Sequence, residues 1–284
     1  MLFLLVSFSI SAQIKGIVVD QKDNPIPYVN IWVENENIGT SSQENGTFTI
    51  TIPKDKTVVF SAVGFETQKI KIPENGKVIL KEAIINLAEV FIEKIRQTKE
   101  IEIGDMQKIH HSQLSGDKPW IYAKLFTYVE KYNETPFIKS IVFYSDSKIK
   151  GAKLKIRLFK LQDSLPTDDL IDEDIIVNVK KGMRKNTIDI STHKLKIPKN
   201  GVVIGLEWLI IPENFYEFTY RDQNKKKISL PNYAPTLVVN YFEERRGFQY
   251  WKGKWYWQHN IKTANNRPWD NKVMTPAINL ILTN

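Results

Sequence analysis

The sequence predicts an all-β protein made of two sandwiches, a small one at the N-terminal end and a larger, jelly-roll-like one after it. Short segments that alternate apolar and polar residues recur at spacings of about 8 to 12 residues, and Gly, Pro and Asn separate them. The chain has 284 residues, which is enough for about two domains. Its hydrophobic content of 42% and charged content of 25% are ordinary for a globular protein, and no apolar run is long enough for a transmembrane helix.

The first residues, MLFLLVSFSISAQ, are apolar or small and suit the core of a signal peptide. We therefore predict an export signal over residues 1–12, truncated at its start because the basic region that normally precedes such a core is missing. A buried first strand is the alternative. An export signal implies a protein of the periplasm or cell surface. The sequence has no cysteine, which excludes disulfides, metal–thiolate sites and a lipid-modified N-terminal cysteine.

Three stretches, residues 14–34, 38–51 and 57–72, predict the strands of the first sandwich. Asn45-Gly46 is a strong turn dipeptide, and the alternation of apolar and polar residues resumes directly after it. Glycines at 39 and 46 permit the φ values of a tight turn between strands. The loop between them is therefore predicted to be structural rather than a phosphate-binding loop.

The motifs of this region occur in a familiar order. They are Gly16–Asp20, Pro25–Ile31, Ile38–Thr40, Asn45–Phe48 and Val63–Thr67. Together they resemble the carboxypeptidase-like regulatory domain, a transthyretin-like β-sandwich found at the N-termini of TonB-dependent receptors and other envelope proteins of Bacteroidota.

The resemblance implies a transthyretin/Ig-like sandwich over residues 13–93, closed by strands at Val78–Leu80 and Leu87–Ile92. It also implies association with the outer membrane, with an outer-membrane or cell-surface protein complex as the partner. One departure is Ser42-Gln43-Glu44, where the family loop usually begins with Thr-Asp. That difference affects the hydrogen bonds that cap the loop.

Catalytic motifs are not recognisable in the sequence. None of the four histidines is followed three residues later by glutamate, so a carboxypeptidase-like zinc pair is not present. There is also no Gly-x-Ser-x-Gly elbow, phosphate loop or HExxH motif. A glycosidase with paired carboxylates from Glu243, Glu244 or Asp270 stays open, although their spacing does not support it. We expect a protein that is not an enzyme and needs no cofactor or metal.

Residues 84–98 fit both a helical face and the closing strand of the family, and we favour the strand. Residues 94–119 are polar and have no sustained periodicity, so we predict a linker there. His110 and His111 are candidate metal ligands within it. Because adjacent residues of a strand point to opposite faces, a linker role is the better interpretation.

Residues 120–284 predict the second sandwich. They contain nine strand-like segments, at 120–131, 136–146, 152–161, 174–179, 186–191, 201–211, 236–242, 248–258 and 277–283. Their order also resembles a poorly characterised domain that often follows the regulatory module in Bacteroidota envelope proteins. This second resemblance implies architecture only.

The formal net charge of +8 raises the question of a nucleic acid or anionic membrane partner. In residues 148–161, however, Lys153, Lys155 and Arg157 alternate with apolar residues, which predicts a strand with a solvated outer face. We therefore expect no nucleic-acid partner. The run Lys225-Lys226-Lys227 is interpreted as a polar loop, with attraction to acidic lipid headgroups or polysaccharide as the alternative.

An acidic run occupies residues 163–175. Its carboxylates are candidate Ca²⁺ ligands, but no EF-hand spacing is present, and a solvated loop is the preferred interpretation. Asp163-Ser164-Leu165 also resembles the short Asp-Ser/Thr-aliphatic O-glycosylation signal used in Bacteroidota.

Residues 247–258, GFQYWKGKWYWQ, predict a hairpin that turns at Lys252-Gly253. Such a turn pairs Trp251 with Lys254 and Gln249 with Tyr256, and it separates two faces. One face is predicted to be core and holds Phe248, Tyr250, Trp255 and Trp257. The other holds the candidate ligand-binding residues Gln249, Trp251, Lys254, Tyr256 and Gln258.

This second face has the composition of a sugar-binding platform, because flat rings stack on the apolar faces of sugars while amides bind hydroxyls. The alternative is that Trp251 and Tyr256 only shield the sheet surface. Taken together, the sequence predicts a non-catalytic, exported binding or scaffold protein of the cell envelope. A glycan-binding protein with polysaccharide as its partner is the second hypothesis.

Overall fold

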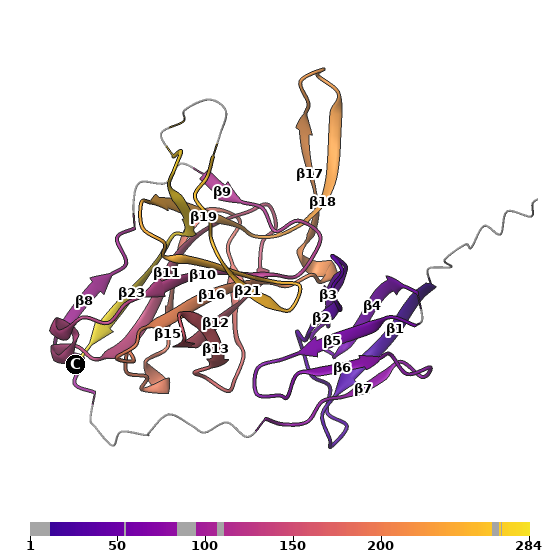
Figure 1. Ribbon diagram of the computed structural model, residues 1–284, viewed down its shortest axis with the longest axis horizontal. Coiled ribbons are helices and arrows are strands. Elements are labelled where there is room, and N and C mark those ends of the chain that lie inside the picture. Colours follow the sequence, from indigo (N-terminus) through magenta and orange to yellow (C-terminus); the bar gives the residue numbers. More distant parts are fainter. Residues whose placement is uncertain (1–11, 54, 84–94, 107–110, 263–266, 268) are drawn as a thin grey trace, which may run out of the picture.

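The computed structural model describes residues 12–53, 55–83, 95–106, 111–262, 267 and 269–284. In these residues the chain forms β-strands, turns and short 3₁₀ helices, arranged as two β-sandwiches side by side (Figure 1). The predicted all-β fold class is confirmed. The predicted export signal, except for Ala12, and the stretch 84–94 lie outside the described residues. No helix in the described part of the chain is long and apolar enough to cross a membrane.

The first sandwich, called here the module, contains seven strands in the described residues. They are β1 (Ala12–Val19), β2 (Asn30–Val33), β3 (Gly39–Ser41), β4 (Thr47–Ile52), β5 (Thr57–Ser61), β6 (Gln68–Lys71) and β7 (Lys77–Ile79). One sheet has the order β4-β1-β7 and the other β3-β2-β5-β6. The buried rings of Phe48 and Phe60 meet edge to face between the sheets, with centroids 5.7 Å apart.

The loop that follows β3 is held by Ser42, where the sequence departs from the loop of the family that it resembles. Ser42 is fully buried, and its hydroxyl accepts a hydrogen bond from the Val29 amide at 2.8 Å and donates one to the Ile26 carbonyl at 3.0 Å. Gly46 adopts a φ of +76°, as the turn prediction requires. The departure from Thr-Asp therefore leaves the loop well capped.

The second sandwich contains two seven-stranded sheets, and every strand pair in them is antiparallel. The first sheet contains β10 (Ile121–Phe126), β12 (Ala152–Gln162), β13 (Leu165–Asp169), β14 (Ile175–Val179), β16 (Val202–Trp208), β20 (Gly247–Trp251) and β21 (Lys254–Trp257). The second contains β8 (Glu100–Ile103), β9 (His111–Gln113), β11 (Phe137–Ser147), β15 (Gly182–Asp189), β19 (Thr236–Phe242), β22 (Val273–Pro276) and β23 (Ile278–Thr283).

Long strands alternate between these two sheets along the chain, and their inner faces enclose the main core, in which Tyr122 and Trp208 are fully buried. The short 3₁₀ helices are η1 (Glu130–Glu134), η2 (Ser191–His193) and η3 (Pro212–Asn214). A further hairpin, formed by β17 (Phe215–Arg221) and β18 (Lys227–Tyr233), is separate from both sheets and projects from the body of the protein (Figure 1).

Two strands lie in residues 94–119, where the sequence predicts a linker. β8 pairs with β23, and β9 pairs with β19, so both extend the second sandwich. Neither strand has the long alternating pattern by which strands are recognised, because each is only three or four residues long. The described part of this segment therefore belongs to the second sandwich.

A buried lysine joins the two sheets of the second sandwich. Lys124 on β10 is 1% exposed, and its ammonium group donates hydrogen bonds to the carbonyl oxygens of Gly104 and Ile278, the latter at 2.8 Å. Burial, together with the nearby charge of Arg246, lowers the pKa of Lys124 to about 7. In the unfolded chain a lysine has an ordinary pKa near 10.4.

Stability is expected to depend on pH through this lysine. Between about pH 7 and about pH 9 the unfolded chain carries a proton on Lys124 that the folded protein has released, so stability rises with pH, by at most about 1.4 kcal/mol per pH unit. Urea unfolding of the wild type and of Lys124→Met across this range tests the expectation. The variant should lose this part of the slope, whereas exposed Lys150→Met should keep it. An unchanged slope in Lys124→Met would contradict the assignment.

Candidate functional site: a groove and a cleft beside the domain interface

The outer face of β12 forms the interface with the module, and the predicted solvated face is wrong. Lys155 is 1% exposed, and its ammonium group donates a 2.9 Å hydrogen bond to the Tyr28 carbonyl and forms a 2.8 Å ion pair with Asp174. Lys153 donates to the Tyr28 hydroxyl at 2.7 Å and to the Glu44 carboxylate at 2.6 Å. The sequence pattern predicts the strand correctly but does not reveal that a second domain covers it.

Arg157 continues this row of cations along β12. Its guanidinium group donates two hydrogen bonds to the Asp169 carboxylate, one of them at 2.9 Å, and lies 3.5 Å from Glu207. Burial alone would lower the pKa of Arg157, but the carboxylates of Asp169 and Glu207 raise it above its ordinary value. Glu207 in turn accepts a 2.7 Å hydrogen bond from the Asn30 amide of the module. The charges of Lys153, Lys155 and Arg157 are therefore paired within and across the interface.

The acidic run 163–175 supplies partners for these cations. Asp169 pairs with Arg157, Asp174 pairs with Lys155, and Glu173 lies 3.3 Å from His193. Among the described residues, no group of three or more histidine, aspartate or glutamate side chains is arranged to hold a metal ion. Asp169 and Asp174 are thus partly buried against the basic strand, while Asp163, Asp168, Asp172 and Glu173 are exposed, as expected for a solvated loop.

Backbone and apolar contacts complete the interface. The Ile210 amide donates to the Ser41 hydroxyl at 3.1 Å, and the Ser41 amide lies 3.4 Å from the Ile210 carbonyl, so the edge strand β3 is covered by the second sandwich. Tyr28 packs with Leu209 and Ile211. Gly64 adopts a φ of +79°, and a Cβ atom there would lie 2.9 Å from the Asp172 carbonyl oxygen. A glycine is therefore needed at this point of close approach between the two domains.

The predicted hairpin is formed by β20 and β21 with the expected register. Trp251 pairs with Lys254, Gln249 with Tyr256, and Phe248 with Trp257. The face predicted as core packs against Ile121, Ala123, Phe159 and Val203 on the outer side of the first sheet, with Phe248 fully buried and its three aromatic neighbours partly exposed.

The candidate ligand-binding residues lie on the opposite face, at the edge of the sheet. Gln249 and Trp251 line a groove, and the Gln258 amide donates to the Gln249 side-chain oxygen at 3.3 Å. Tyr256 is 37% exposed, and Lys254 is exposed opposite Trp251. The structure therefore brings together Gln249, Trp251 and Gln258, while Tyr256 and Lys254 flank them toward solvent.

The groove has a volume of about 410 Å³ and lies between the two domains. The module contributes Trp32 and Asn37, the stretch 113–120 contributes one wall, and β20 contributes the other. Trp120 is fixed in that wall because its ring stacks on Trp208 with centroids 4.5 Å apart. Indole rings, amides and one carboxylate thus surround a single hollow.

One donor in the groove lining has no partner. Trp32 is 2% exposed, and its indole Nε1 has no hydrogen-bond acceptor among the described residues. A buried donor without an acceptor costs about 1 to 3 kcal/mol, and such groups are rare in native proteins. Neither Trp32 nor Trp120 carries a signal in the sequence that would place it beside Trp251, because the groove forms only when the domains meet.

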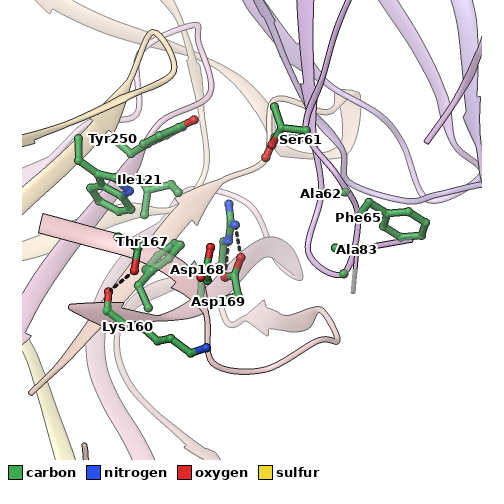
Figure 2. Close-up of a pocket in the computed structure, with 15 residues that line it drawn as sticks. Ser61, Ala62, Phe65, Ala83, Ile121, Lys160, Thr167, Asp168, Asp169 and Tyr250 are labelled. Atoms are coloured by element: carbon green, nitrogen blue, oxygen red, sulfur yellow. Dashed lines mark hydrogen bonds and ion pairs between the residues drawn. The ribbon is translucent and has the colours of Figure 1, made fainter. Parts of the chain in front are cut away.

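A second hollow, the interface cleft, also has a volume of about 410 Å³ and opens between the domains. Figure 2 shows Tyr250 and Ile121 on one side, Ser61 and Phe65 of the module across from them, and Asp169 below. Burial raises the pKa of the Tyr250 hydroxyl. Two charged groups of this cleft pair with each other, because the Arg157 guanidinium donates hydrogen bonds to the Asp169 carboxylate.

The remaining candidates lie apart from both hollows. The ring of His111 meets those of Tyr241 and Trp269 edge to face, at centroid distances of 5.5 and 4.5 Å, which is a packing role; His110 lies outside the described residues. Glu244 forms a 3.0 Å ion pair with Arg246, and Asp270 accepts a hydrogen bond from the Arg267 amide at 2.9 Å.

The protein is thus a two-domain β protein. A small β-sandwich module is fixed to a larger β-sandwich through buried charges, and two hollows lie at the junction. Residues 14–92 match the model of the CarboxypepD_reg-like domain, so this part of the chain is similar to that family. The TonB-dependent receptor SusC of Bacteroides thetaiotaomicron is 28% identical over 110 residues. That match covers 38% of this chain and 11% of the receptor, so this chain corresponds to only a small part of its curated relative.

Two solved structures are similar to the chain at low identity. One contains the cysteine protease and lectin-like domains of Cwp84, a surface layer associated protein of Clostridium difficile, with 13% identity, a TM-score of 0.41, and coverage of 87% of this chain and 45% of that one. The other is the same clostridial protease after propeptide cleavage, with 12% identity, a TM-score of 0.43, and coverage of 87% and 51%.

Lys155 is expected to be indispensable for the interface. Lys155→Ala leaves the Tyr28 carbonyl and the partly buried Asp174 carboxylate without their partner, and should lower the free energy of unfolding by about 3 kcal/mol. Urea titration measures this loss. The paired change Lys155→Met with Asp174→Leu removes both charges and should recover most of it. Exposed Lys150→Ala should stay within about 0.5 kcal/mol of the wild type. A similarly small effect of Lys155→Ala would contradict the structural role.

Proposed function

We propose that the protein is a non-catalytic, exported binding or scaffold protein of the cell envelope, and an accessory component of an outer-membrane or surface assembly. One observation carries this proposal. The module, which is similar in sequence to part of an outer-membrane receptor, is fixed to the second sandwich through the edge strand β3, while β6 ends the same sheet on the other side.

The β6 edge supports a role in protein contact. No other strand in the described residues pairs with β6 beyond β5. An unpaired edge offers backbone donors and acceptors to an added strand. Lys69 and Lys71 are both exposed, and Lys69 forms a 3.1 Å ion pair with Glu34. Lysines on an edge discourage indiscriminate pairing, so they favour a partner strand that carries acidic side chains.

Purification of the tagged protein from native envelopes in mild detergent, with mass spectrometry of the bound proteins, tests this function. We expect one membrane protein in stoichiometric amount. Lys69→Glu with Lys71→Glu should reduce its recovery about tenfold or more, because like charges then face each other across the contact. Lys22→Glu, on an exposed turn of the module, should leave recovery unchanged. Purification of the wild type alone would refute the scaffold function.

A second function, glycan binding, is favoured by the groove. Its indole rings match the apolar faces of a pyranose, and Gln249, Gln113 and Asn37 carry amides that bind hydroxyl groups. Trp32 adds a further indole ring to the groove lining. The volume of about 410 Å³ lies within the range of about 300 to 1,000 Å³ typical of small-molecule sites.

Affinity electrophoresis in envelope polysaccharide tests the glycan function. Trp251→Ala should weaken binding at least about tenfold, since it removes the ring of the groove wall. Tyr256→Ala changes the same sheet face outside the groove lining, so its effect should be smaller. Circular dichroism should show that both variants keep the wild-type fold. Equal effects of the two changes, or no retardation of the wild type, would contradict binding in the groove.

A further inference from the structure

The β17–β18 hairpin is amphipathic. Phe218 pairs with Leu230 and Tyr220 with Ile228, and because paired residues share a face, these four side chains form one apolar surface. Toward the tip the opposite face is polar: Ser229 donates to the Glu217 carboxylate at 2.9 Å and lies 3.2 Å from the Thr219 hydroxyl. At the base of the hairpin this face carries the paired rings of Phe215 and Tyr233. The hairpin thus has the two-sided pattern of a strand pair that packs on something, yet it belongs to neither sheet.

The apolar face is not covered by the described part of the protein. Tyr220 is 43% exposed and Leu230 is 47% exposed, which places both among the large hydrophobic residues that remain exposed in the described chain. Figure 1 shows the hairpin extending away from both sandwiches. An isolated two-stranded hairpin is only marginally stable in water, so an uncovered apolar face indicates an external surface on which it packs.

The tip of the hairpin is strongly basic. Arg221, Lys225, Lys226 and Lys227 are all exposed there, against one carboxylate, that of Asp222. That carboxylate accepts hydrogen bonds from the backbone amides of Asn224 and Lys226, at 2.9 and 2.8 Å, and so is used to shape the turn. The Arg221 guanidinium donates to the Lys225 carbonyl at 2.9 Å, which helps to hold the turn. The tip is an ordered cluster of cations.

We propose that this hairpin holds the protein against an anionic membrane surface. Apolar and aromatic side chains beside a cluster of lysines match the boundary between acyl chains and acidic headgroups. The unpaired outer edges of a two-stranded ribbon exclude it from the hydrocarbon core, where backbone groups have no water. The hairpin therefore lies in the headgroup layer, with its apolar face toward the acyl chains and its tip among the phosphates. This inference is independent of the proposed receptor partner and of the groove.

Flotation of the purified full chain with vesicles tests the proposal. Vesicles of phosphatidylcholine mixed with phosphatidylglycerol should carry the protein, and vesicles of phosphatidylcholine alone should carry far less of it. Changing Lys225, Lys226 and Lys227 together to Gln should lower the partition coefficient about 100-fold. The matched control changes the exposed lysines 180, 181 and 185 to Gln, which alters the net charge equally on another part of the second sandwich and should have a small effect.

The apolar face is tested separately by Tyr220→Ser with Leu230→Ser. This pair should weaken binding to anionic vesicles about tenfold or more while leaving its dependence on salt unchanged, since the cations remain. Near-ultraviolet circular dichroism should match the wild type in every variant. The proposal is overturned if the wild type does not float with anionic vesicles, if the control lysines matter as much as those of the tip, or if the apolar pair has no effect. The first of these outcomes would assign the hairpin to a protein partner.

Discussion

The structure depends on the pairing of the buried charges on β12. Lys155 and Arg157 lie on the outer face of a strand, a position that would be solvated if the second sandwich stood alone. Burying a charge is costly unless it is paired and hydrogen-bonded, and here the partners come from both directions: Asp169 and Asp174 from the same domain, and the Tyr28 carbonyl from the module. The module can therefore bury these cations only when the acidic run has folded against β12 and supplies Asp169 and Asp174 as partners.

This constraint explains why the two hollows exist. The groove takes Trp32 from the module and Trp251 from the second sandwich, and the cleft likewise takes Phe65 from one and Tyr250 from the other. Neither hollow has a complete lining within one domain. Because a buried, directional network fixes the relative position of the domains, the side chains of the groove are held in place before any ligand arrives, which reduces the entropy lost on binding.

The residue pattern of a segment predicts its secondary structure here, but it does not predict burial or contacts that involve another domain. The hairpin of Gln249 and Tyr256 was predictable to the residue pair, since turn chemistry and period-two alternation fix its register. The alternation around Lys155 also predicted a strand correctly. The burial of Lys155 was not predictable, because the alternating pattern around a lysine is the same whether water or a second domain covers its side chain. The short strands β8 and β9 were missed for a related reason, as they are defined by their partners rather than by their own residues.

The β17–β18 hairpin has a clear period-two pattern, but no sheet in the described chain buries its apolar face. In the core, period-two patterns are explained by the sheet that buries them, so a pattern with an apolar face and no sheet requires a surface outside the described chain. The polar network at Thr219, Ser229 and Glu217 links the two strands on their other side and leaves the apolar face free to contact that surface. The rigid junction and the projecting hairpin are thus separable parts: buried charges fix the domains to one another, and exposed charges and rings are left for an external surface.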